Sequence, residues 1–440
     1  MTIERWDAVE TAERIRRGDV TPSEVLEAAI ARAEAVSPLG AIVTSSFDRA
    51  RAAIAELPAG VFAGVPTFVK DLSQVRGVAT TWGSAGSVGF VSQRDDPFVK
   101  RFARTGVVVL GKSATPELGL TATTEPLFAP PTRNPRDPSR SAGGSSGGAG
   151  ALVAAGVVPI AHGSDGGGSI RIPAACCGVI GFKPSRGRLD MEGSRLLPVN
   201  VAVHGVLTRS LRDTIVFHQA VAGLEAVAEA PARPLRIGVF SDAPGVSVDP
   251  DVRAAVAATA KQCAALGHEV VELRCPFDGS VMDDFLAYWG FVAWAQLRGA
   301  RVAMHRGFDR TRIEPWTAGL VRSFTSRRRA ALGAIRRLRR FARRYAEVMQ
   351  RSDILLSPTL SQPAPPLGHL ATDSFEAHFE RLRAFAAFTP MANAAGAPAI
   401  SLPLAATPTG LPIGVHLSAR RGDDHSLLEL AQTLMKSGSY

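Results

Sequence analysis

Cysteines and long hydrophobic runs are scarce in this sequence of 440 residues. There are four cysteines, two of them adjacent at Cys176 and Cys177, and none has metal-ligand spacing. So few cysteines exclude a disulfide-stapled scaffold and predict small buried thiols in a reducing compartment. The most apolar run, 149–161, contains Pro159 and is too short to cross a bilayer. Residues 1–7 lack a basic flank followed by an apolar stretch, so we expect no signal peptide, no membrane association and a cytoplasmic location.

Aromatic residues are also few, at 6%, and charged residues make up 20% of the chain, whereas hydrophobic residues reach 46%. This balance excludes an intrinsically disordered protein and a coiled coil, because the chain is able to bury a large core. Forty-two glycines and thirty prolines show no collagen-like period and predict many tight turns. The composition is that of a globular protein.

The net charge of +10 comes from one segment that lacks acidic residues. Ten arginines lie between Arg322 and Arg344 without a single Asp or Glu, and the rest of the chain is balanced. Apolar residues recur within the segment at three-residue spacing, which predicts an amphipathic helix with a solvated arginine face. Nucleic-acid binding through this face is the alternative interpretation, but no nucleic-acid motif accompanies it, and we expect no such partner. The apolar residues are Leu332, Ile335, Leu338 and Phe341.

The order of elements along the chain predicts an α/β fold with a central mixed sheet covered by helices on both faces. One unit of strand, helix and strand is expected over 235–273, with the helix opening at Asp249-Pro250. The capping box Thr21-Pro22-Ser23-Glu24 opens a helix to about Val36, and another helix precedes it from about Ile3 to Arg17. We expect one domain, 1–440, made of an N-terminal helical hairpin (1–60), a glycine-rich core (61–225), a variable helical cover (278–350) and closing strands (399–417).

Two motifs match known patterns by letter only. Residues 106–113 fit the phosphate-binding pattern G-x-x-x-x-G-K-S, but strand formers fill the place of the phosphate loop. Residues 143–147 fit the nucleophile-elbow pattern G-x-S-x-G, but the preceding segment 132–140 is expected to be a loop and not a strand. We therefore predict neither a phosphate site nor a nucleophile elbow.

The informative region contains two glycine- and serine-rich loops, 141–148 and 163–169, which flank a small-residue helix or strand at 149–158. Glycine clusters let several backbone N–H groups point to one spot, which is how an oxyanion hole is built. A serine on each loop would supply a nucleophile and a proton relay. Both would still need a base.

These loops closely resemble the signature region of the amidase signature family, whose members hydrolyse amide bonds with a Lys–Ser–Ser triad. The resemblance covers most of the chain. Segments 64–71 and 111–117 upstream, and 355–359 and 393–403 downstream, are similar to further family elements. The resemblance implies a single α/β/α amidase domain.

Carried over residue by residue, the resemblance makes Ser169 the nucleophile, Ser145 the bridging serine and Lys70 the base. It also implies a cis peptide between Gly144 and Ser145. Lys70 serves as a base only when neutral, so burial or a cationic neighbour must lower its pKa. The separations of 75 and 24 residues along the chain fit the family's triad.

Further residues follow from the same resemblance. The backbone N–H groups of four consecutive residues, Gly166, Gly167, Gly168 and Ser169, are expected to form the oxyanion hole. Supporting polar residues are expected at Ser146, Asp165 and Arg171, and substrate contacts at Gly119, Leu120 and Thr121. Aromatic residues of the cover are candidates for an apolar pocket, with ordinary core packing as the alternative: Phe285, Tyr288, Trp289, Phe291, Trp294 and Trp316.

The resulting prediction is a serine amidohydrolase acting on a small amide or carbamate through an acyl-enzyme, without a metal or organic cofactor. Aryl and aliphatic amides, anilides, cyclic amides and carbamates fit this chemistry, with esterase or urethanase side activity. Gly166 stands where threonine is common in the family, which favours branches acting on cyclic amides and anilides. The alternatives are a glutaminase-type subunit of an amidotransferase and an arginine-rich nucleic-acid-binding protein on this scaffold. A monomer or homodimer is expected.

Overall fold

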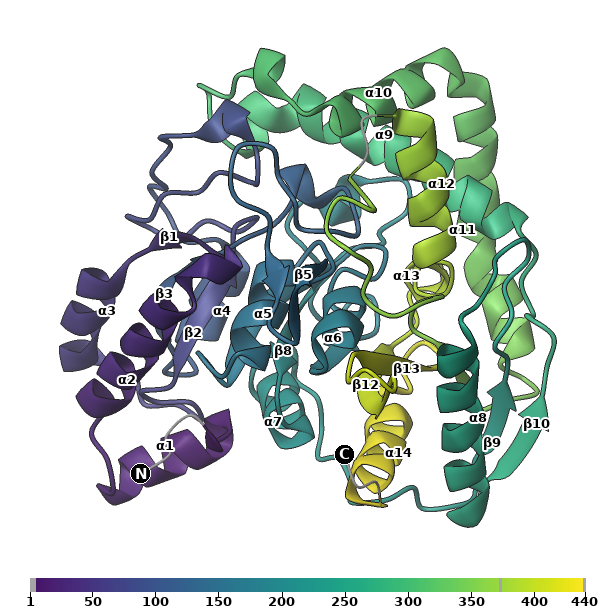
Figure 1. Cartoon of the computed structure of the whole chain (residues 1–440), viewed down its shortest axis with the longest axis horizontal. Coiled ribbons are helices and arrows are strands. Elements are labelled where there is room, and N and C mark those ends of the chain that lie inside the picture. Colours follow the sequence, from purple (N-terminus) through teal and green to yellow (C-terminus); the bar gives the residue numbers. More distant parts are fainter. Residues whose placement is uncertain (1–4, 372–373, 438–440) are drawn as a thin grey trace.

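The computed structural model describes residues 5–371 and 374–437, and its centre is an eight-stranded mixed sheet (Figure 1). The strands follow the order β10-β9-β11-β13-β12-β7-β8-β6. Pairing is parallel for β10, β9 and β11 and antiparallel across the rest, so the predicted mixed sheet is confirmed. The strands are β6 (Ile160–Asp165), β7 (Ile180–Lys183), β8 (Val203–Thr208), β9 (Arg236–Val239), β10 (Glu269–Glu272), β11 (Ile354–Pro358), β12 (Ala399–Ala406) and β13 (Pro412–Ala419).

A smaller sheet, formed by β1 (Ile42–Ser45), β3 (Val108–Ser113) and β2 (Pro66–Lys70), extends the structure beyond β6. The Thr67 hydroxyl donates to the Ile160 carbonyl at 2.9 Å, and this contact joins β2 to β6. The last residue of β2, Lys70, is thereby placed beside the end of β6. Strand β3 includes Lys112, so the segment that matched the phosphate-binding pattern at 106–113 forms a strand and not a phosphate loop.

Helices cover both faces of the large sheet. Side chains alternate along β13: Gly414 and His416 face α6, where their neighbours are Ala175 and Arg171. The intervening residues point to the opposite face, where α8 and α14 pack against β12 and β13. The helices outside the cover are α1 (Ala8–Arg17), α2 (Pro22–Ala35), α3 (Phe47–Ala53), α4 (Pro97–Ala103), α5 (Gly147–Ala154), α6 (Arg171–Cys177), α7 (Leu211–Ala222), α8 (Pro250–Ala265), α12 (Phe375–Phe385), α13 (Pro390–Ala395) and α14 (Asp424–Ser437).

The N-terminal segment is richer than the predicted hairpin, because it also contains β1 and α3. The capping box is confirmed, with Glu24 N–H donating to the Thr21 hydroxyl and Thr21 N–H donating to the Glu24 carboxylate. Helix α1 begins at Ala8, where Asp7 caps it; the first residues of the predicted helix lie outside the described part of the chain. Residues 132–140 are not a plain loop, since β4 (Arg133–Asn134) and β5 (Asp137–Ser141) form a short hairpin.

Three helices, α9 (Ser280–Ala303), α10 (Pro315–Ser326) and α11 (Arg328–Val348), occupy most of the segment 278–350 and run across the top and right of Figure 1. Helix α11 carries eight of the ten arginines, whereas Arg322 lies on α10 and Arg327 between the two helices, so the basic segment is not one helix. Ile335, Leu338 and Phe341 on α11 are buried. Leu332 is 55% exposed, so the predicted stripe is wrong at its first member. Each step of three residues falls about 60° short of a full turn, so four residues at this spacing do not stay on one face of the helix.

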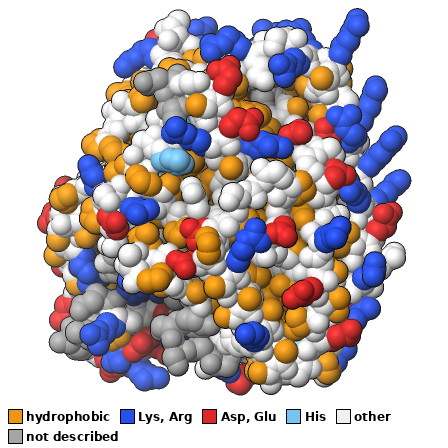
Figure 2. Space-filling view, turned by 45° about the vertical axis from the view of Figure 1, so that its right-hand side comes forward, with side chains coloured by type: hydrophobic (Ala, Val, Ile, Leu, Met, Phe, Trp, Pro, Cys, Tyr) orange, Lys and Arg blue, Asp and Glu red, His pale blue; other side chains and the backbone are white. Residues whose placement is uncertain are grey.

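Part of the arginine charge is neutralised within the cover. Arg337 pairs with Asp284 at 2.6 Å and Arg344 with Asp278 at 2.7 Å. Elsewhere Lys and Arg side chains project into solvent, as the right-hand edge of Figure 2 shows. Among residues 5–371 and 374–437, no helix is long and apolar enough to cross a membrane.

Candidate active site

Lys70 lies at the end of β2 with its side chain fully buried. Its amine is 2.8 Å from the Ser145 hydroxyl, 2.8 Å from the Ser146 hydroxyl and 3.0 Å from the Ser164 hydroxyl. Burial lowers the pKa of Lys70 from 10.5 to about 7, although the Asp165 carboxylate opposes this shift. A large fraction of the amine is therefore neutral at neutral pH and able to accept a proton.

The carboxylates of Asp71, next to Lys70 in the sequence, and Asp165, near it in space, form ion pairs with other side chains. Asp71 pairs with buried Lys112 at 2.7 Å and accepts the Thr81 N–H at 2.9 Å. Asp165 pairs with Arg171 at 2.9 Å. Within the described chain Lys70 itself forms no ion pair, so little compensates for the cost of burying its charged form.

A chain of histidines fixes the backbone of Lys70. Its N–H donates to Nδ1 of His162 at 3.2 Å, so the ring hydrogen of His162 must be on Nε2, which lies 3.0 Å from Nδ1 of His204. Nε2 of His204 in turn donates to the Glu192 carboxylate at 2.8 Å. Burial, with His204 as a second cause, holds the pKa of His162 well below 6.5, which keeps that ring neutral. No local sequence signal marks these histidines, because their roles depend on strands distant in the chain.

The first glycine–serine loop enters α5 through a cis peptide between Gly144 and Ser145, as the resemblance implied. Ser146 N–H donates to the Ser169 carbonyl at 3.1 Å, which joins the two loops. The Ser146 hydroxyl accepts a hydrogen bond from the Lys70 amine and also contacts the backbone of Ser164 at 3.3 Å. Ser164 is a further polar neighbour of the lysine that sequence analysis did not single out.

The second loop, 163–169, is shaped around the buried Asp165 carboxylate. This carboxylate accepts the Gly168 N–H at 2.8 Å and the Ile170 N–H at 3.2 Å. The Gly168 N–H is thus already used, contrary to the expectation that it faces an oxyanion. In the described chain, the N–H groups of Gly166, Gly167 and Ser169 have no hydrogen-bond partner.

Only glycine fits at position 168. Its φ is +128°, and a Cβ there would lie 2.2 Å from the Thr389 hydroxyl oxygen. That hydroxyl donates to the Gly167 carbonyl at 2.7 Å, so Thr389 fixes the loop from outside. The residue before α13 therefore shapes the loop that carries Ser169, which sequence analysis did not anticipate.

Arg171 and Asn393 complete the support of this loop. Arg171 donates two hydrogen bonds to Asp165 and holds the pKa of that fully buried carboxyl well below its usual range. Asn393 accepts from Arg171 at 2.6 Å and donates to Asp165 at 2.8 Å. The segment that contains Asn393 was part of the family resemblance, whereas His416, 2.9 Å from Arg171, was not.

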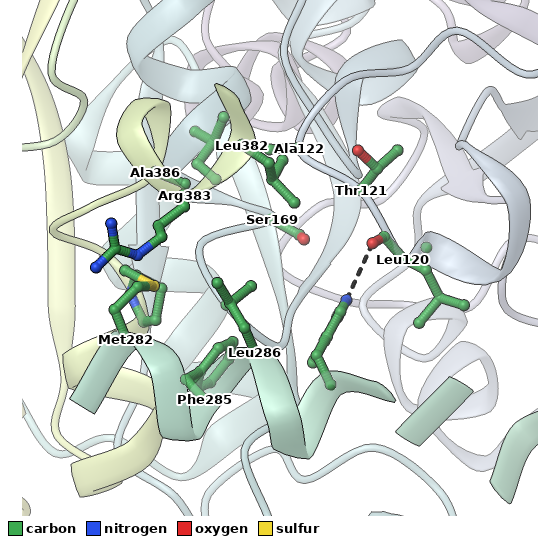
Figure 3. A pocket seen from close by; sticks show the side chains of 15 residues that line it. Leu120, Thr121, Ala122, Ser169, Met282, Phe285, Leu286, Leu382, Arg383 and Ala386 are labelled. Carbon is green, nitrogen blue, oxygen red and sulfur yellow. Dashed lines mark hydrogen bonds between the residues drawn. The ribbon is translucent and has the colours of Figure 1, made fainter. Parts of the chain in front are cut away.

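Ser169 opens onto an apolar cavity with about 470 Å³ of empty space, its solvent-open mouth included (Figure 3). The Ser169 oxygen points into this cavity, while Arg383, its one charged lining residue, directs its guanidinium away from the serine. No hydrogen bond joins the hydroxyls of Ser145 and Ser169 in the described chain. The remaining lining comes from the 119–122 loop (Gly119, Leu120, Thr121, Ala122), from α9 (Met282, Phe285, Leu286, Trp289), from α12 and the turn after it (Leu382, Ala386, Pro390), and from Gly167 and Ile172.

The 119–121 loop is held rigidly against the cover. The Leu120 carbonyl accepts hydrogen bonds from the indole N–H groups of Trp289 and Trp316, each at 3.0 Å. The Thr121 hydroxyl is 3.0 Å from Nε2 of His378, a residue of α12. All three residues predicted to contact substrate thus line the cavity.

Of the six aromatic candidates in the cover, Phe285 and Trp289 line the cavity. The other four do not line it and pack within the protein, which is the alternative that the sequence left open. Tyr288 is fully buried and donates to the Val199 carbonyl, and Trp316 stands behind the 119–121 loop. Phe291 and Trp294 pack instead on the ring of Phe324, with centroids 5.5 Å and 5.4 Å away. Along one helix, only side chains about one turn apart face the same way.

Residues 24–428 match the Amidase family, and the chain therefore belongs to the amidase signature family. It is 42% identical to "Putative amidase AmiC" of Mycobacterium leprae (strain TN), over 97% of this chain and 93% of that protein. It is 35% identical to the 6-aminohexanoate-cyclic-dimer hydrolase of Pseudomonas sp. (strain NK87), over 98% and 95%. The solved structure of a 6-aminohexanoate cyclic dimer hydrolase complexed with substrate superposes with a TM-score of 0.91 at 31% identity, covering 100% of this chain and 98% of that one.

The protein is thus an amidase, a hydrolase acting on carbon–nitrogen bonds. In the part of the chain that the structure describes, no cluster of three or more His, Cys, Asp or Glu side chains is placed to hold a metal ion. Cys176 and Cys177, at the end of α6, are buried, and burial raises the pKa of each thiol.

Proposed function

We propose that this amidase cleaves small amides through an acyl-enzyme formed on Ser169, with Ser145 as the proton relay and Lys70 as the base. The observation that carries the proposal is the buried Lys70 amine, 2.8 Å from the Ser145 hydroxyl and with a pKa of about 7. A neutral amine accepts the Ser145 proton while still donating to the hydroxyls of Ser146 and Ser164.

The proton path starts at the nucleophile. The Ser169 oxygen attacks the amide carbonyl, its proton passes to Ser145, and the Ser145 proton passes to Lys70. The contact between the two serines closes when substrate is bound, since catalytic hydrogen bonds are often long in the free enzyme. Lys70 then returns the proton through Ser145 to the leaving nitrogen, and water hydrolyses the acyl-enzyme by the reverse path.

The tetrahedral oxyanion would be held by backbone N–H groups of the second loop. Those of Gly166, Gly167 and Ser169 are available, whereas that of Gly168 is engaged by Asp165. Removing one such donor typically costs about 3–4 kcal/mol of transition-state stabilisation. We therefore restrict the proposed hole to three of the four residues that the sequence predicted.

An apolar cavity favours neutral amides with apolar groups next to the carbonyl or the nitrogen. Aryl and aliphatic amides, anilides, cyclic amides and carbamates meet this description, and the relatives that hydrolyse a cyclic dimer support the cyclic amides. The lining contains no pair of opposite charges, so it has no groups that would select a charged substrate such as an amino acid.

The test is a comparison of wild type with Ser169→Ala on p-nitroanilides, primary amides, a cyclic diamide, an aryl carbamate and p-nitrophenyl esters. Ser401→Ala is the matched control, because Ser401 is also buried but lies outside the cavity, where its hydroxyl forms a hydrogen bond with that of Thr359. We expect Ser169→Ala to lose essentially all turnover and the control to keep it. Turnover that persists in folded Ser169→Ala would refute the nucleophile.

A further inference from the structure

A second cavity, with about 450 Å³ of empty space when its solvent-open mouth is included, adjoins the cavity that holds Ser169. It is lined by Ala243 and Val246 after β9, by Phe277 before α9, and by Ala387 and Met391 at the turn from α12 to α13. None of these residues lines the first cavity. The second cavity therefore adds surface that the catalytic groups do not use.

The two cavities share a wall made of Met282, Arg383 and Pro390. Met282 and Arg383 have long, unbranched side chains that change rotamer without moving the backbone. Figure 3 shows both at one end of the first cavity, on the side away from Leu120. The wall is thus thin and adaptable where the two spaces meet.

The charged groups at this junction are already paired. Nε of Arg383 donates to Asp283 at 3.2 Å, and Asp278, which lines the second cavity, is held by Arg344 at 2.7 Å. An occupant with a charge would have to compete with these pairs. The remaining surface, formed by alanine, valine, proline, methionine and phenylalanine side chains together with Cys275 and Gly279, suits an uncharged aliphatic or aryl group.

We propose that the two cavities form one substrate site with two lobes, in which the amide reacts at Ser169 and an uncharged aliphatic or aryl arm of the substrate lies in the second cavity. This rests on the proposed function. Together the two cavities offer a longer apolar surface than either one alone, as an elongated amide requires. Displacement of Met282 and Arg383 connects them.

The experiment measures how fast alkyl fluorophosphonates with arms of two to ten carbons label the enzyme, because the Ser169 oxygen displaces fluoride whatever the natural amide is. In wild type the labelling rate should rise with arm length, by up to about fourfold per methylene that is buried. Two variants fill the second cavity, Val246→Trp and Ala387→Phe. The control is Val271→Trp, at a 39% exposed position on β10 that lines neither cavity.

We expect each filling variant to lower the ratio of ten-carbon to two-carbon labelling rates at least tenfold, and Val271→Trp to keep the wild-type ratio. An unchanged ratio in either folded filling variant overturns the two-lobed site, as does a wild-type rate that is independent of arm length. Peptide mapping separates this outcome from failure of the proposed function. Label on Ser169 without an effect of arm length refutes only the second lobe, whereas labelling of Ser169→Ala at the wild-type rate refutes the nucleophile.

Discussion

Replacing Lys70 by methionine should abolish amide hydrolysis and, at low pH, stabilise the fold. The folded protein holds the pKa of Lys70 at about 7, against 10.5 for a free lysine, because burial disfavours the charged amine. Below pH 7 the lysine is charged in both the folded and the unfolded protein. The lowering of its pKa then corresponds to a native state destabilised by about 5 kcal/mol. Methionine fills similar space without a charge.

The pH dependence is the sharper part of this prediction. Between pH 7 and 10.5 the unfolded chain binds more protons than the folded one, so wild-type stability rises with pH in that window. From pH 6 to pH 9 the stability advantage of Lys70→Met over wild type should shrink by about 3 kcal/mol. The serine hydroxyls left without the amine cost about 1–3 kcal/mol, but that loss does not vary with pH.

Urea unfolding of both proteins at pH 6 and pH 9 measures this difference. Lys183→Met is the matched control, because Lys183 is also fully buried, also has its pKa lowered to about 7 by burial, and donates to the Pro184 carbonyl. It should show the same shift in stability but keep activity. In wild type, kcat should rise with pH through about 7 and level off near pH 9, as Lys70 loses its proton. A kcat that is flat from pH 5 to 9, or a stability gap between Lys70→Met and wild type that is constant with pH, would refute the reasoning.

Three further outcomes are expected. Gly168→Ala should lower kcat at least about tenfold, because its Cβ meets the Thr389 hydroxyl and its φ is positive; steady-state kinetics equal to wild type would contradict this. Arg171→Met should lower the free energy of unfolding by about 3–5 kcal/mol, since it leaves Asp165 buried without its cation; a loss below about 1 kcal/mol in urea would argue against the buried pair. Fluorescence anisotropy should detect no binding of duplex DNA at physiological salt, whereas a clear salt-dependent affinity would revive nucleic-acid binding by α11.

Local sequence signals predicted much of the secondary structure. The capping box opened α2, the pattern over 235–273 became β9, α8 and β10, and the segment 278–350 became helices. These signals act within a few residues, which is why the sequence alone reveals them. The short β1 and the hairpin 133–141 were missed, because strands of two to five residues depend on partners elsewhere in the chain.

The candidate catalytic residues were equally readable, because the signature loops are contiguous. The structure brings Lys70 and Ser145 together at 2.8 Å and places Ser169 at the cavity, and their roles are the proposal that the variants test. Sequence did not reveal Thr389 beneath the second loop or His162 behind the lysine. Each bond joins segments about 90 to 220 residues apart, where no local pattern exists.

By itself, then, the sequence determined the α/β class, the family and which residues are proposed to carry the chemistry, since these reside in local patterns and short motifs. Only the tertiary structure decided that Gly168 turns its N–H to Asp165 and that Phe285 and Trp289, but not Phe291, reach the cavity. It also decided that a second cavity lies beyond Met282. The direction of an N–H group and the shape of a cavity depend on how distant segments pack, and packing is set by the whole chain at once.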